Sequence, residues 1–131
     1  MRNGGQILVE SLVALGAKKA FGVPGESYLG LTDALSDFPG INLVVCRHEG
    51  GAGFMAAADG RMRNGRAGVA LVSRGPGATN AMIALHTAYH DATPLVMLIG
   101  HVERKDIGRL ALQEQNYSRL LSDVTKGVFE V

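Results

Sequence analysis

The chain has 131 residues, of which 47% are hydrophobic and 19% are charged, and its formal net charge is +1. This composition is that of one globular domain and excludes a disordered chain. The near-neutral charge, without blocks of lysine or arginine, argues against nucleic-acid and anionic-membrane partners. A single cysteine, Cys46, excludes an intrachain disulfide and a cysteine-rich metal site, so the cytoplasm is the expected location. The longest apolar run, residues 95–99, is far shorter than the ~20 residues that span a membrane.

The first half of the chain predicts two helices and two strands. Leu8, Leu12 and Leu15 recur at helical spacing, and Gly16 ends this helix. Residues 18–23 (KKAFGV) predict a short strand, and an apolar stripe within residues 31–38 predicts a second helix. Residues 41–46 (INLVVC) are almost continuously apolar, which is typical of a parallel strand that is buried on both faces.

The second half continues this alternation. Residues 51–63 predict an alanine-rich helix, residues 67–73 a buried strand, and residues 75–80 a turn that enters a helix. Residues 94–100 (PLVMLIG) predict a fourth strand, residues 113–121 a helix, and residues 126–131 the start of a further strand. Strands that alternate with helices predict an α/β fold, an open parallel sheet with helices on both faces.

Three glycine-rich turns follow predicted strands: residues 23–26 (VPGE), 48–51 (HEGG) and 73–77 (SRGPG). In an open parallel sheet, ligands bind beyond the carboxyl ends of the strands. Glycines let a ligand approach the backbone, and helix N-termini supply N–H groups. The turns therefore predict a crevice at this edge, although glycines that serve only strand-to-helix connections would give the same pattern.

Glu49 is the strongest candidate for a catalytic side chain. It lies just past an apolar strand and just before a helix. The helix N-terminus favours its charged form, whereas burial favours its neutral form. Such a carboxylate is suited to sharing a proton with a ligand nitrogen. The alternative is an isolated glutamate on a solvated helix start.

Other patterns carry less information. Residues 51–56 match G-x-G-x-x-A, the dinucleotide fingerprint, but the acidic residue expected about 20 positions later is missing. His86 and His90 have i, i+4 spacing without the glutamate of H-E-x-x-H, so they predict no metal site. Asp59 and Asp91 are interpreted as helix caps or surface charges, and Cys46 as a small buried hydrophobic residue.

Taken together, the motifs resemble the N-terminal pyrimidine-binding domain of thiamine-diphosphate enzymes of the acetolactate synthase type. The resemblance covers essentially the whole chain and keeps the order of the family's motifs. It rests on residues 21–25 (FGVPG), 47–49 (RHE) followed by Gly51 and Ala52, 73–80 (SRGPGATN), Asp91 with 94–100, 112–114 (LQE) and 125–126 (TK).

The resemblance implies that thiamine diphosphate is the cofactor and that Glu49 is the catalytic residue. In this family the glutamate is hydrogen-bonded to N1′ of the aminopyrimidine, and sharing a proton there promotes loss of the C2 proton of the thiazolium ring. The resemblance also implies cofactor contacts at Val23, Pro24, Gly25, Pro76 and Asn80, and substrate-side positions at Ser27, Leu112 and Gln113.

The resemblance further implies a larger assembly. Full chains of the family have about 550 residues in three domains, each of ordinary domain size. The last of these holds Mg²⁺ through a Gly-Asp-Gly motif, which residues 1–131 lack. We therefore expect a single pyrimidine-binding domain, as the N-terminal part of a longer enzyme or as a separate small subunit, inactive when isolated. The expected partners are a 2-oxo acid and further copies in a dimer or tetramer, and the need for FAD is left open.

Four positions depart from many acetolactate synthases. Gly50 and Phe54 stand where glutamine and histidine are usual, Leu112 replaces a phenylalanine, and Arg74 replaces a small hydroxyl residue. These departures leave cofactor activation intact. They keep open a decarboxylase or lyase that acts on another 2-oxo acid, of the benzoylformate, sulfopyruvate or oxalyl-CoA type. A dinucleotide-binding module is a further alternative, as is an inactive interaction subunit, against which Glu49 argues.

Overall fold

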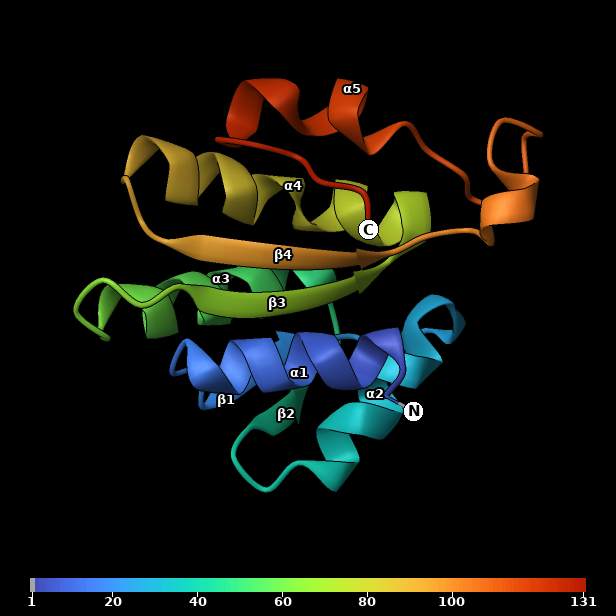
Figure 1. Ribbon diagram of the computed structural model, residues 1–131. Coiled ribbons are helices and arrows are strands. Elements are labelled where there is room, and N and C mark those ends of the chain that lie inside the picture. The colour runs from blue at the N-terminus through green and yellow to red at the C-terminus, as the bar shows by residue number, and fades with distance from the viewer. Residues whose placement is uncertain (1) are drawn as a thin grey trace.

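The sheet is four-stranded, entirely parallel and ordered β2-β1-β3-β4 (Figure 1). The computed structural model describes residues 2–131. The strands are β1 (Lys19–Gly22), β2 (Asn42–Val45), β3 (Gly68–Ser73) and β4 (Leu95–Gly100). The α/β fold with an open parallel sheet that the sequence predicts is thereby confirmed, and all four predicted strands up to residue 100 are present.

Helices cover both faces of the sheet. On one face lie α1 (Gly4–Ala14) and α2 (Leu29–Asp37), which follows a short 3₁₀ helix, η1 (Glu26–Tyr28). The other face carries α3 (Glu49–Arg61) and α4 (Arg74–His90). Successive side chains of a strand point to opposite faces, so Val69 and Leu71 pack with the first pair of helices. Ala70 and Val72 pack with the second pair.

The apolar side chains of β3 form the middle of the core. Val69, Leu71 and Val72 are each at most 2% exposed, as is Val9 of α1. Burial of one such side chain stabilises a fold by roughly 1.5–3 kcal/mol. The near-continuous apolar run of the third predicted strand is therefore explained by burial on both faces, as expected for a parallel strand.

Small residues bring α3 and α4 close together. A Cβ atom added at Gly53 would lie 2.5 Å from the Cβ of Ala84, so no larger side chain fits between the two helices at this point. A Cβ atom at Gly68 would lie 1.7 Å from the carbonyl oxygen of Ala56. The alanine and glycine content of these segments thus sets how near the helices lie to each other and to β3.

The predictions for residues 113–131 need correction. The helix predicted over residues 113–121 is shorter, because α5 spans only Tyr117–Leu121 and Gln113 has a φ of 64°. Asn116 begins α5, since its Oδ1 accepts the N–H of Arg119 at 2.9 Å. Residues 126–131 form no strand, and Phe129 is 87% exposed. Alternating apolar residues favour extended backbone there, but a strand also requires pairing with a sheet edge.

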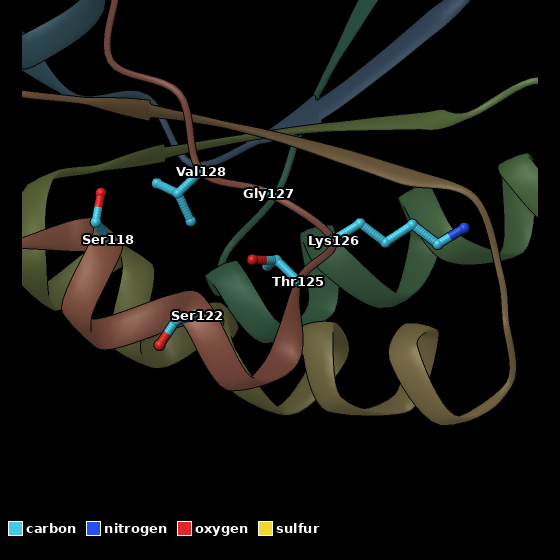
Figure 2. A pocket seen from close by; sticks show the side chains of 6 residues that line it. All are labelled: Ser118, Ser122, Thr125, Lys126, Gly127 and Val128. Carbon is cyan, nitrogen blue, oxygen red and sulfur yellow. The ribbon is translucent and has the colours of Figure 1, made fainter.

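The carboxyl ends of all four strands meet at one edge of the sheet. The chain beyond β4 projects from this edge through a 3₁₀ helix, η2 (Arg104–Asp106), before it returns to α5 (Figure 1). After α5 and a third 3₁₀ helix, η3 (Ser122–Val124), the last residues run back along α5 and line a pocket of about 290 Å³ (Figure 2). None of the helices described is long and apolar enough to cross a membrane.

Candidate active site

Glu49 is the first residue of α3, and the residue before it shapes this helix start. His48 has extended backbone, with φ −155° and ψ 139°, and its Nδ1 accepts the N–H of Gly50 at 3.0 Å. Gly50 is buried, and a Cβ atom there would lie 3.1 Å from the carbonyl oxygen of Asn80. The imidazole therefore satisfies one of the free N–H groups of the helix, and the absent side chain of Gly50 lets α4 lie beside Glu49.

A second helix supplies a partner for the Glu49 carboxylate. Nδ2 of Asn80, in α4, donates to Oε2 of Glu49 at 2.9 Å. The other oxygen, Oε1, accepts no hydrogen bond from residues 2–131, and Glu49 is only half-buried. One carboxylate oxygen is thus held in place, while the other is available to a ligand.

The turn after β1 is anchored by a tyrosine that lies near this carboxylate. The hydroxyl of Tyr28 donates to the carbonyl oxygen of Val23. Burial, and secondly the negative charge of Glu49, raise the pKa of Tyr28 to about 12. Tyr28 is therefore a neutral donor at physiological pH, and it connects the Val23 turn to the surroundings of Glu49.

Gly25 lets the same turn lie against the end of β3. A Cβ atom at Gly25 would lie 2.5 Å from the Cβ and 2.6 Å from the Oγ of Ser73. Oγ of Ser73 in turn lies 2.9 Å from Oγ of Ser27. The segment that follows β1 is therefore in direct contact with the last residue of β3. Pro24, within the turn that follows β1, is exposed.

The remaining sequence-predicted residues lie on the turn after β3 and on the segment after β4. Pro76 is exposed, and it is already part of α4, because this helix begins at Arg74 and the turn predicted over residues 75–80 is helical. Leu112 is 72% exposed. The N–H of Gly75 donates to the carbonyl oxygen of Gln113 at 3.0 Å, which brings Gln113 to the β3–α4 junction.

Asp59, Asp91 and Cys46 have ordinary structural roles. Arg61 forms an ion pair with Asp91 at 2.7 Å, and Arg63 forms one with Asp59 at the same distance. Cys46 is 6% exposed, and burial raises the pKa of its thiol. Among residues 2–131, no three histidine, cysteine, aspartate or glutamate side chains are placed to hold a metal ion.

The G-x-G-x-x-A match does not form a phosphate-binding turn. Gly51, Gly53 and Ala56 all lie inside α3, which begins at Glu49. Gly53 faces Ala84 of the neighbouring helix. In the dinucleotide fingerprint the glycines form the turn that precedes the helix. The structure therefore assigns the second glycine of this match to helix packing, and the dinucleotide-binding alternative has no structural support.

The Glu49 carboxylate is half-buried and lies outside the two pockets described along the chain. Two pockets, of about 470 Å³ and 290 Å³, are found along α2 and between α5 and the last residues. Glu49 lines neither of them.

Sequence reasoning missed three residues that organise this edge. In the sequence, Tyr28 belongs to no motif, Arg74 stands out only as a departure from the family, and Glu114 only as part of a motif. Glu114 accepts the N–H groups of Gly108 and of Ala111, the latter at 3.0 Å, and these bonds lower the pKa of its carboxyl group. For Arg74 the sequence does offer a signal, because a charged residue stands within a glycine-rich turn. The role of Tyr28 leaves no sequence pattern, because its hydroxyl donates to the backbone carbonyl group of Val23, which every residue type has.

Comparison with known proteins identifies relatives over the whole chain. Residues 2–120 match the family described as thiamine pyrophosphate enzyme, N-terminal TPP binding domain. The chain is 44% identical over 132 residues to the acetolactate synthase isozyme 3 large subunit of Escherichia coli, covering 100% of this chain and 23% of that protein. It is 40% identical to the catabolic acetolactate synthase of Raoultella terrigena and to the acetolactate synthase of Bacillus subtilis, with 98% of this chain covered in each case. The chain spans 23% and 22% of the length of these two relatives.

Proposed function

Because the chain belongs to the thiamine pyrophosphate enzymes, as their N-terminal TPP binding domain, we propose that it forms the pyrimidine-side wall of an active site for 2-oxo acids. The proposed activity is acetolactate synthesis, since the relatives at 36–44% identity carry that name. No observation favours a decarboxylase or lyase of another type. The contact between Glu49 and Asn80 at the carboxyl edge is the observation that carries this proposal.

The residues at this edge fit an aminopyrimidine ring. Glu49 presents one carboxylate oxygen to a ligand, while Asn80 holds the other. When bound, thiamine diphosphate supplies the carbanion-stabilising chemistry. Glu49 is the catalytic residue of the proposal, and it shares a proton with a ring nitrogen through Oε1. Asn80 keeps the carboxylate in one orientation, which is the requirement for general acid–base catalysis by a positioned group.

The neighbouring turns complete the proposed wall. Val23, Pro24 and Gly25 line the cofactor after β1, and Pro76 lines it at the start of α4. The close approach of Gly25 to Ser73 keeps the turn after β1 beside the end of β3, which leads into α4. Ser27, Leu112 and Gln113 form the substrate side of the proposal. The exposure of Leu112 and Gln113 is consistent with a face that meets a ligand or another domain.

The opposite wall is proposed to come from another domain of a longer enzyme. We propose residues 1–131 as the N-terminal domain of a three-domain chain of about 550 residues, in line with usual domain sizes. Mg²⁺ and the diphosphate group would be held by the third domain, and FAD, if it is required, would be held largely by the middle domain. The single buried cysteine is consistent with the cytoplasm.

Self-association is proposed as a dimer or tetramer, in which a second copy supplies the other wall. Apolar side chains on the outer faces of α3 and α4 support this proposal, because Phe54, Met55, Ile83 and Tyr89 are each 41–59% exposed. Light scattering on the full-length enzyme is expected to show at least a dimer, and an active monomer would contradict the arrangement.

The experiment that tests the proposed function is Glu49→Gln in the full-length enzyme. Glutamine keeps the shape and one oxygen but does not share a proton with the ring nitrogen. Hydrogen–deuterium exchange at C2 of thiamine diphosphate is expected to slow by about 10²–10⁴-fold, the usual effect of losing a positioned acid–base group. Glu130→Gln, at an exposed glutamate, is the matched control and is expected to leave the rate unchanged. Exchange at the wild-type rate in Glu49→Gln would show that Glu49 does not activate the cofactor.

A further inference from the structure

Arg74 connects two segments of the carboxyl edge that are far apart in sequence. Its Nη2 lies 3.3 Å from Oε1 of Glu26, in η1, and its Nη1 donates to the carbonyl oxygen of Leu112 at 3.3 Å. The Arg74 side chain is only 18% exposed, whereas that of Glu26 is 72% exposed. The guanidinium group therefore lies between the segment that precedes α2 and the segment that precedes α5, and it makes one contact to each.

The segment that Arg74 contacts has an ordered backbone of its own. Leu110 and Gln113 have φ values of 57° and 64°, in the left-handed region. The Glu114 carboxylate accepts the N–H groups of Gly108 and Ala111, which fixes the bend internally. These internal bonds do not fix the position of the bend relative to the sheet. The contacts of Arg74 with Leu112 and of Gly75 with Gln113 fix that position.

Arg74 is energetically unfavourable in two ways, which argues for a role beyond packing. Its φ of 48° lies in the left-handed region, which is costly for a residue other than glycine. Its Nε is buried and has no hydrogen-bond partner among residues 2–131, and the same holds for the hydroxyl of Tyr117. The positive charge of Arg74 opposes the effect of burial on the pKa of Tyr117, so the two groups are neighbours. Strain and unpartnered polar atoms of this kind concentrate at functional sites.

We propose that Arg74 is a positioning residue that holds the Leu112–Gln113 bend against η1 and thereby sets the apparent affinity of the enzyme for its 2-oxo acid. This inference rests on the proposed function, in which Ser27, Leu112 and Gln113 form the substrate side. The planar guanidinium presents several donors in a fixed fork, so it reaches Glu26 and Leu112 at the same time. A lysine has a single point charge and does not span both partners.

The test compares Arg74→Met and Arg74→Lys in the full-length protein by hydrogen-exchange mass spectrometry, which requires no activity. Residues 107–116 are expected to exchange roughly tenfold faster in Arg74→Met, the scale set by one lost hydrogen bond to a charged group. The buried strand β3 is expected to keep its protection in the same sample. Arg74→Lys is expected to remain clearly faster than wild type in residues 107–116.

Arg109→Met is the matched control. Arg109 lies in the same segment and is exposed, and its side chain makes no hydrogen bond or ion pair with any residue of the described part. Removal of this charge is expected to leave exchange in residues 107–116 unchanged. Equal exchange in Arg74→Met and wild type would overturn the inference, as would full restoration by Arg74→Lys or loss of protection in β3 to the same extent.

Kinetics with pyruvate as the probe give a second readout. In Arg74→Met, KM is expected to rise about tenfold with kcat within about twofold, which is the pattern for lost uniform binding. The rate of C2 exchange in thiamine diphosphate is expected to stay at the wild-type value. A fall in kcat with unchanged KM would contradict a positioning role. Failure of the proposed function would show instead as an unaffected C2 exchange rate in Glu49→Gln. This result does not depend on the amide exchange rate of residues 107–116 in Arg74→Met, so the two failures are distinguishable.

Discussion

The side-chain amide of Asn80 donates to the carboxylate of Glu49 at 2.9 Å, across a separation of 31 positions in the chain. The two residues come from α3 and α4, which pack closely because small residues line both helices. The orientation of Glu49 therefore depends on the packing of a helix pair. A carboxylate fixed in this way keeps its geometry when a ligand approaches the oxygen that Asn80 leaves available.

Asn80→Asp tests this relationship in the full-length enzyme. The substitution keeps the size of the side chain but replaces the donor by a second carboxylate, so the contact with Glu49 becomes repulsive. C2 exchange in thiamine diphosphate is expected to slow by about tenfold, the scale of one hydrogen bond to a charged group. Asn42→Asp, at an exposed asparagine of β2, is the control and is expected to have no effect on the exchange rate. An unchanged rate in Asn80→Asp would show that Glu49 needs no such support.

Gly25→Ala tests whether close contact between the turn after β1 and the end of β3 is required. The added Cβ atom would lie 2.5 Å from the Cβ of Ser73, and this atom cannot move without moving the end of β3. The thermal midpoint is expected to fall, with a loss of about 1–3 kcal/mol in the free energy of unfolding, as for an overpacked core. Gly30→Ala, where a Cβ atom meets nothing within 4 Å, is expected to be neutral or to stabilise by up to about 1 kcal/mol. A Gly25→Ala midpoint equal to that of wild type would mean that the turn has room to relax.

The strands could be predicted from the sequence, because a buried parallel strand leaves a strong local pattern. The placement of the glycine-rich turns at one edge of the sheet follows from the strands that precede them. The run of residues 67–73 predicts β3 for this reason, and it is almost fully buried. Contacts between distant residues leave no such pattern. Nothing local in the neighbourhood of Arg74 predicts that its side chain contacts Glu26 and Leu112.

The errors near the end of the chain have a related physical cause. Residues 113–116 have helical composition, but Gln113 adopts a φ of 64°, and its carbonyl group accepts the N–H of Gly75 from another part of the chain. Residues 126–131 have the alternation of a strand, yet Val128 instead packs beside α5 and η3. In both segments, tertiary contacts override a short-range preference.

The isolated 131 residues are predicted to bind thiamine diphosphate weakly and to show no turnover. The edge around Glu49 supplies one wall, and residues 2–131 contain no cluster of ligands for a metal ion that could pair with a diphosphate. Isothermal titration calorimetry with Mg²⁺ present is expected to show no micromolar binding. The full-length enzyme under the same conditions is the positive control. Tight, Mg²⁺-dependent binding by the isolated chain would show that it holds the diphosphate group itself.

Tyr28→Phe tests the anchoring of the Val23 turn through pH dependence. At neutral pH the variant is expected to be less stable by about 1 kcal/mol, the net value of one hydrogen bond, because the hydroxyl no longer donates to Val23. The pKa of Tyr28 is raised from 10.0 to about 12 in the folded chain. A raised pKa means that the stabilisation by the neutral hydroxyl is complete below pH 10 and is lost as the pH rises through 12.

The free energy of unfolding of wild type minus that of Tyr28→Phe is therefore expected to be constant up to about pH 10 and then to fall. Two pKa units correspond to roughly 2.7 kcal/mol, so this difference is expected to pass through zero before about pH 12, above which the variant is the more stable protein. Denaturant unfolding of both proteins across this range measures the difference directly, and other groups that titrate in both proteins cancel. Tyr89→Phe, at a tyrosine that is 52% exposed, is the control for removing a hydroxyl without a buried partner and is expected to leave stability unchanged. A rise in wild-type stability relative to the variant from pH 10 to 12 would require the folded chain to favour the ionised form of Tyr28, which burial and the nearby Glu49 carboxylate both oppose.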